Sequence, residues 1–117
     1  MGANMTSPQA RKGATYERDV VEFLRANGHP YAERAYGAGR PDDVGDIDGI
    51  VGWALELKNH KQLALSGWLD EAEVERVNAR ARFAAVIAKR RGKSVGQSYV
   101  LMTLETFCAV LDEEVEA

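Results

Sequence analysis

The chain has 117 residues, of which 45% are hydrophobic and 28% charged, and its formal net charge is −3 at pH 7. This length supports one domain with a single core, and the composition is that of a globular protein. No apolar run approaches the roughly 20 residues that span a bilayer, and no signal-peptide pattern opens the chain. The single cysteine excludes an intrachain disulfide and a cysteine-based zinc site. We therefore expect a cytoplasmic protein without membrane contact.

We expect a flexible leader over residues 1–10, one folded domain over residues 11–113 and an acidic tail over residues 114–117. A first helix is expected to begin between Gln9 and Thr15 and to end near Asn27, where the following glycine is a stop signal. Its inward stripe is expected to consist of Tyr16, Val20, Phe23 and Leu24. A short strand over residues 31–35 and a flexible loop over residues 36–43 follow.

Residues 45–58 predict a β-hairpin with one apolar and one charged face. Because side chains alternate along a strand, Leu55 and Leu57 are expected in the core with Ile47 from the first strand. The opposite face then carries Glu56 and Lys58.

Acids on the first strand of this hairpin share the face of Glu56. With a turn around residues 50–52, Asp46 lies directly opposite Glu56, with Cβ atoms roughly 4.5–5.5 Å apart, and Asp48 competes for the same role. Two carboxylates about 4 Å apart repel by about 1 kcal/mol in water and by about 4 kcal/mol at an effective dielectric near 20. Mg²⁺ relieves such repulsion and keeps waters that can act as nucleophiles, and Lys58 can orient a phosphate. The alternative is an exposed hairpin with a stabilising Glu–Lys pair.

The second half of the chain predicts two helices and two strands. We expect a helix from about Gly67 to Arg80 or Arg82, capped by Ser66, and a final helix from Leu104 to about Glu113, capped by Thr103. The first of these helices is expected to face inward through Leu69, Ala72, Val77 and Trp68, and the final one through Phe107, Cys108 and Leu111. The apolar run 83–88 predicts a buried strand, and residues 98–102 the next one. The order α-β-β-β-α-β-β-α predicts an α/β fold, a mixed sheet flanked by helices.

Charge is distributed unevenly along the chain. Acids gather around the hairpin and at the C-terminus, whereas no acid occurs from Arg76 to Leu104. That window contains a basic turn over residues 90–93, and backbone phosphates are bound by such cations. A separate acidic site and basic surface are typical of a metal-dependent nuclease. The alternative is a solvated helix face followed by a basic turn.

Two segments carry a resemblance to a known family. The segment Arg11-Lys12-Gly13, followed by Glu17-Arg18 in the same helix, resembles the opening helix of the archaeal-type Holliday-junction resolvases. The hairpin, with Asp46 followed by Glu56-Leu57-Lys58, resembles the Asp and Glu-x-Lys elements of the PD-(D/E)xK nuclease superfamily. The resemblance covers roughly residues 11–90 and implies the restriction-endonuclease-like fold. The chain departs from the family in two places: Gly-Ala-Gly replaces a serine-containing loop, and the hairpin is shorter.

The resemblance implies a set of functional residues. Glu17, Asp46, Glu56 and Lys58 would be catalytic, and the three acids would bind Mg²⁺, for which Mn²⁺ would substitute, with Asp48 as an alternative ligand. We expect DNA contacts from basic residues on several elements, namely Arg11, Lys12, Arg34, Arg40, Lys61, Arg90, Arg91 and Lys93.

The expected activity is that of a Mg²⁺-dependent endonuclease of recombination or repair that cuts branched DNA such as four-way junctions by phosphodiester hydrolysis. Symmetric cutting needs two active sites, so we expect a homodimer, with interfaces along helix 67–82 or segment 61–68. The alternatives are a restriction- or repair-type nuclease on linear or nicked DNA, and a non-catalytic DNA-binding module on the same fold. The ratio of ten Arg to five Lys points to a GC-rich genome, and a phage source would place the protein in the host cytoplasm.

Overall fold

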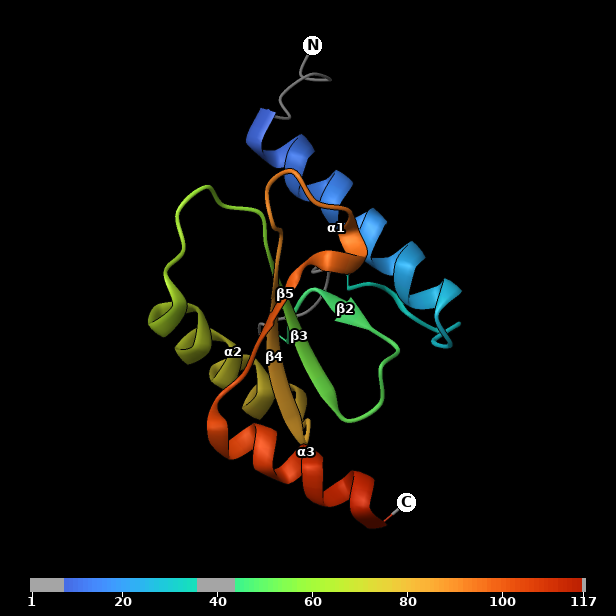
Figure 1. The fold of residues 1–117 in the computed structure, drawn as a ribbon, viewed down its shortest axis with the longest axis vertical. Helices are drawn as coiled ribbons and strands as arrows, with labels where there is room; N and C mark the ends of the chain where they lie inside the picture. The colour runs from blue at the N-terminus through green and yellow to red at the C-terminus, as the bar shows by residue number, and fades with distance from the viewer. Residues whose placement is uncertain (1–7, 36–43, 117) are drawn as a thin grey trace.

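The computed structural model describes residues 8–35 and 44–116. In this part of the chain, a mixed five-stranded sheet is flanked by three helices (Figure 1). The elements are α1 (Pro8–Ala26), β1 (Glu33–Arg34), β2 (Ile47–Asp48), β3 (Trp53–Lys58), α2 (Leu65–Ala79), β4 (Phe83–Ala88), the 3₁₀ turn η2 (Val95–Gln97), β5 (Tyr99–Leu101) and α3 (Leu104–Glu116). The α/β class and the order of helices and strands confirm the sequence prediction.

Several boundaries differ from those expected. Helix α1 begins at Pro8, inside the expected leader, and α3 continues to Glu116, inside the expected tail. Strand β1 has only two residues, and each pairs with one of the two residues of β2. The prediction that Ser66 caps α2 is wrong. The N-cap is Ala64, which makes no side-chain capping bond, and Ser66 lies within the helix. The expected loop 36–43 lies outside the described residues.

The strands lie side by side in chain order, β1-β2-β3-β4-β5. Strands β3 and β4 are parallel, and α2 forms the crossover between them, whereas the other neighbours are antiparallel. Because parallel strands end at the same edge of a sheet, Lys58 at the end of β3 lies beside Ala88 at the end of β4. The next residue, Lys89, donates its amide to the Lys58 carbonyl over 2.9 Å.

Helices α1 and α2 cover opposite faces of the sheet (Figure 1). The α1 face contains a core in which Tyr16 and Val20 pack with Ile47, Leu55 and Leu57, as the alternation of the hairpin predicted. On the α2 face, a second core joins residues of the helix to those of β3 and β4, namely Ala54, Trp68, Ala72, Ala84, Val86 and Ala88. Ala85 of β4 belongs to the core on the α1 face. Strand β4 therefore contributes to both cores, which explains its continuous apolar sequence.

Some side chains predicted to face inward are exposed instead. Val77 is 59% exposed because α2 turns Trp68, Ala72 and Glu75 toward the sheet, and Val77 lies off that line. Phe23 is 41% exposed. It lies against η2, where a Cβ on Gly96 would come within 2.7 Å of the Phe23 ring.

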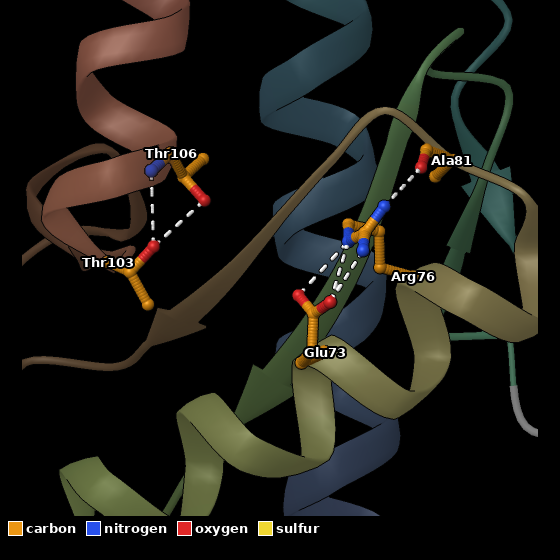
Figure 2. Close-up of polar contacts among 5 residues, drawn as sticks. All are labelled: Glu73, Arg76, Ala81, Thr103 and Thr106. Atoms are coloured by element: carbon orange, nitrogen blue, oxygen red, sulfur yellow. Dashed lines mark hydrogen bonds and ion pairs between the residues drawn. The ribbon is translucent and has the colours of Figure 1, made fainter.

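The inward stripe predicted for α3 is also wrong. Phe107, Cys108 and Leu111 are all exposed, and no described residue of this helix is buried. The cap of α3, in contrast, confirms the prediction: the Thr103 hydroxyl accepts the Thr106 amide over 3.1 Å (Figure 2). No helix in the described ranges has the length and apolar character needed to cross a bilayer.

Candidate functional site

The charged end of β3 contacts α2. Glu56 and Lys58 alternate with Leu55 and Leu57, which are buried on the α1 face, so the two charged side chains face α2. The Lys58 Nζ lies 3.3 Å from Glu56 Oε2 and 2.9 Å from Glu71 Oε1. The side chains of Glu56 and Lys58 are only 13% and 14% exposed. These contacts assemble a cluster of three charges at the carboxyl end of β3, in which Glu56 and Lys58 are shielded and Glu71 is 56% exposed.

The ion pairs of this cluster determine the charge state of Lys58. Burial of Lys58 tends to lower its pKa, but its contacts with Glu71 and Glu56 outweigh this effect, so the pKa of Lys58 is raised above its ordinary value. The Trp68 ring lies 5.9 Å from the Lys58 Nζ and 5.6 Å from the His60 ring. Since Trp68 is buried, it belongs to the core and leaves the ammonium few positions to occupy.

Glu71 was not predicted to belong to this cluster. The signal was present, because Glu71 follows Trp68 by three residues and side chains at this spacing are neighbours on a helix surface. Only the packing of α2 on β3 reveals that this side of the helix meets Lys58.

Asp46 lies beside Glu56, in agreement with the predicted hairpin register. Its amide donates to the Leu55 carbonyl, and its Oδ2 accepts the Leu57 amide, each over 2.8 Å. Asp46 is thus bonded to the main chain on both sides of Glu56. Gly45 permits this approach, since its φ is 100° and a Cβ there would lie 2.9 Å from the Leu55 oxygen.

The competing acid, Asp48, lies farther along β2. Its register partner is Glu33 of β1, whereas Ile47 pairs with Leu55. Each step along β2 away from Asp46 leads away from Glu56, because the two strands run antiparallel. The hairpin therefore brings Asp46, rather than Asp48, to the main chain around Glu56.

Glu17 has a different neighbour from the one its predicted role requires. It projects from α1, on the opposite face of the sheet from α2, and its Oε1 accepts the Arg34 Nε over 2.9 Å. Within residues 8–35 and 44–116, no group of three or more His, Cys, Asp or Glu side chains is arranged to hold a metal ion. The predicted ligand set of Glu17, Asp46 and Glu56 is therefore not assembled, since Arg34 holds the Glu17 carboxylate.

Two carboxylates nevertheless fit a magnesium ion. Mg²⁺ is usually bound through one or two carboxylates, several waters and the phosphates of a substrate, rather than by a cage of protein ligands. Asp46 and Glu56 supply hard oxygen donors at neighbouring positions of the hairpin. The donor set is suited to such an ion, with Glu17 outside it.

A basic groove lies at the same edge of the sheet as the charged cluster, but on the α1 side. It has a volume of about 470 Å³, and we define it by its polar lining residues Arg11, Lys12, Asn59 and Lys89. Asn59 directly follows Lys58, and its side-chain amide donates to the Lys12 carbonyl over 3.4 Å. Neither Lys12 nor Lys89 forms an ion pair with a carboxylate of the described residues. Two of the predicted DNA-binding residues, Arg11 and Lys12, are thus brought together.

Lys89 and Asn59 were not predicted as groove residues. Both directly follow strands of a parallel pair, and ligands of α/β sheets commonly bind beyond the carboxyl ends of such strands. The groove wall includes Tyr16, whose hydroxyl donates to Ser98 Oγ over 2.7 Å. Burial raises the pKa of Tyr16, with partial compensation by this hydrogen bond, so Tyr16 remains neutral and the charge of the groove is cationic.

The other predicted DNA-binding residues in the described ranges do not line the groove. Arg34 pairs with Glu17, and Arg90 lies 5.2 Å from the Tyr99 ring and donates to the Gln97 carbonyl over 3.4 Å. Lys61 is exposed after β3, and Arg91 and Lys93 are exposed after β4. Arg40 lies outside the described residues.

Comparisons with known proteins assign no family. No protein-family model matches the chain, and neither a curated protein nor a solved structure matches it.

Proposed function

We propose that the chain is a Mg²⁺-dependent endodeoxyribonuclease with a PD-(D/E)xK fold, and that it cuts branched DNA such as four-way junctions. One observation carries the proposal: Asp46 is bonded to the main chain on both sides of Glu56, and Lys58 lies 3.3 Å from Glu56. This arrangement corresponds to the Asp and Glu-x-Lys elements of the superfamily that the sequence resembles.

Each residue of the cluster has a chemical role in this proposal. Asp46 and Glu56 would hold Mg²⁺, or Mn²⁺ in its place, and the ion would supply charge for the phosphate and a water of lowered pKa. Lys58, kept protonated by Glu56 and Glu71, presents its ammonium to the phosphate as negative charge develops there. Glu71 acts through Lys58 by fixing the position of its Nζ.

The basic groove supplies a cationic surface for DNA, which the charged cluster lacks. A chain with net charge −3 needs a local concentration of cations to hold DNA, because phosphate contacts dominate affinity. Lys12 and Lys89 provide such cations beside Asn59, the residue after Lys58. The groove lies on the α1 side and the charged cluster faces α2, so a DNA strand bound in the groove would have to cross the carboxyl ends of β3 and β4 to bring a phosphate to the cluster.

A cleavage assay tests the proposal. The purified chain with Mg²⁺ would receive a labelled four-way junction and a linear duplex built from the same arms. We expect preferential cutting of the junction and at least a 100-fold loss of rate, on the order of a lost transition-state contact, in Glu56→Gln and Lys58→Met. Glu73→Gln is the matched control, since Glu73 also forms an ion pair, with Arg76 over 3.0 Å (Figure 2), outside the cluster.

The outcomes separate the candidate activities. Equal cutting of both substrates would remove the junction preference and favour a restriction- or repair-type nuclease on linear or nicked DNA. Absence of Mg²⁺-dependent cutting would remove the enzymatic proposal, as would Glu56→Gln and Lys58→Met variants that cut like the original chain.

A second candidate, a non-catalytic DNA-binding module on a nuclease fold, has one observation in its favour. Lys58 forms ion pairs with two carboxylates, and the described residues include no group of three potential ligands for a metal. Such a module would bind the junction through the groove without Mg²⁺, and Glu56→Gln would leave that binding unchanged.

A further inference from the structure

Helix α3 has an apolar stripe that nothing in the described chain covers. Leu104, Phe107 and Leu111 are 75%, 47% and 43% exposed, and Cys108 is exposed as well. Their spacing of three, four and seven residues places them on one side of the helix. We call these four residues the α3 stripe. A stripe of this pattern usually faces a core, so its exposure is unexpected.

The rest of the chain holds α3 weakly. A helix of 13 residues is marginal in water unless an amphipathic face packs against something, and no described residue of α3 is buried. Thr106, Ala109 and Val110, on the side of the helix opposite the stripe, are only half-buried. The polar contacts of the helix include the Thr103 cap (Figure 2) and an ion pair between Arg82 and Glu113 over 2.7 Å. Exposed ion pairs contribute little, and no basic residue in the last turn complements the helix dipole. The helix therefore leaves its most apolar side without a partner among the described residues.

The charges around the stripe restrict what that partner is. The four stripe residues are uncharged, so they offer nothing to nucleic acid phosphates. Neighbouring residues of α3 include Glu105, Asp112 and Glu113, which oppose binding to an anionic lipid surface. These acids flank the stripe and do not interrupt it, so the uncharged residues of two copies of this chain can meet one another.

Strand β5, which precedes α3, offers a second surface that another chain could contact. It lies at the edge of the sheet and connects to α3 through only two residues. With three residues, Tyr99–Leu101, it offers few pairing groups, but it contains no charge or proline that would block pairing with another chain. Val100 is 59% exposed. An edge of this kind can pair with the same edge of a second copy in an antiparallel, two-fold arrangement.

We propose that the α3 stripe and the edge of β5 form the interface of a two-fold homodimer. Whole apolar side chains present about 150–200 Å² each, so Leu104, Phe107, Leu111 and Val100 together expose about 400 Å². Because about 60% of an interface is apolar, two such surfaces correspond to about 1,300 Å² in total, within the range of stable interfaces. The homodimer interface is thus assigned to different elements from those expected, helix 67–82 and segment 61–68. It does not depend on the proposed nuclease activity.

Sedimentation velocity of the full chain over a range of concentrations tests this interface. We expect a species of twice the chain mass, and a single-chain species for Leu104→Glu combined with Phe107→Glu. The matched control is Val74→Glu combined with Val77→Glu, two valines of α2 that are each 59% exposed. This control is expected to remain dimeric. Far-UV circular dichroism would establish that both variants are folded.

Cys108 provides a second measurement on the unchanged chain. It is the single cysteine and lies within the stripe, so its alkylation by iodoacetamide is expected to slow at least tenfold between dilute and concentrated protein. A monomeric chain at all concentrations would overturn the proposal. So would a constant alkylation rate, or a dimer that dissociates through the α2 variant and persists in the α3 variant. Because these readouts involve no DNA, they fail or succeed independently of the nuclease assay.

Discussion

Lys58 pairs with Glu56 of its own strand and with Glu71 of α2, and the contact with Glu71 has a measurable consequence. Glu71→Gln removes the closer of the two carboxylates, which lies 2.9 Å from Nζ, while Glu56 and the burial of the ammonium remain. The pKa of Lys58 is therefore expected to fall. A titration of the Lys58 side chain by NMR measures the shift, and Glu73→Gln, whose carboxylate pairs with Arg76, is expected to leave it unchanged.

The raised pKa of Lys58 also makes a statement about stability. The folded chain holds the Lys58 proton more tightly than the unfolded chain does, where the pKa is about 10.4. The stabilisation is therefore fully present below that pH and is lost as the pH rises through the higher folded value. Urea unfolding is expected to distinguish the original chain from Glu71→Gln at pH 7 to 9, and the difference is expected to shrink in strong alkali. A difference that grows with pH would contradict the ion-pair origin.

At the residue scale, the sequence predicted the face on which a side chain lies better than the side chain that it contacts. The hairpin alternation identified Glu56 and Lys58 as one face and brought Asp46 to Glu56, because strand periodicity is a local property. It did not predict that Arg34 holds Glu17 or that Glu71 meets Lys58. Those contacts join separate elements, and they depend on which face of the sheet each helix covers.

At the element scale, the two predicted helix caps provide a matched pair. Thr103 accepts the Thr106 amide at the start of α3, whereas Ser66 makes no capping bond in α2. Thr103→Ala is expected to lower the free energy of unfolding by about 1 kcal/mol, and Ser66→Ala to change it by less than about 0.5 kcal/mol. Urea denaturation of the two variants measures both values. Equal losses would show that the Thr103 bond contributes nothing.

Elements with a strong local pattern were predicted well. Strand β4 has the predicted bounds, because burial on both faces requires an unbroken apolar run. The inward face of α3 was not predicted correctly, since periodicity reveals that a helix has an apolar side but not what covers it. Val77 of α2 was misassigned for a related reason: the buried position on that helix is occupied by Glu75, which no hydrophobic pattern would select.

At the scale of the whole molecule, the net charge conceals a local concentration of cations. If the basic groove binds DNA phosphates, Lys12→Ala and Lys89→Ala are each expected to reduce the slope of log affinity against log salt by about 1. Arg82→Ala is the matched control. It removes the same charge at the opposite end of β4, where Arg82 pairs with Glu113 over 2.7 Å. Fluorescence anisotropy with labelled DNA measures the slopes, and equal slopes for Lys89→Ala and Arg82→Ala would contradict the groove.

The hydrogen bond from the Lys89 amide to the Lys58 carbonyl limits the stage of synthesis at which the candidate site can form. It closes a segment that contains the whole of α2, so the acids of the hairpin and the last lysine of the groove meet only after the crossover has docked. A ribosome releases the hairpin first and Lys89 some thirty residues later. A nascent or truncated chain would therefore carry the acids without the groove, and the proposed nuclease would be inactive until its synthesis had passed β4.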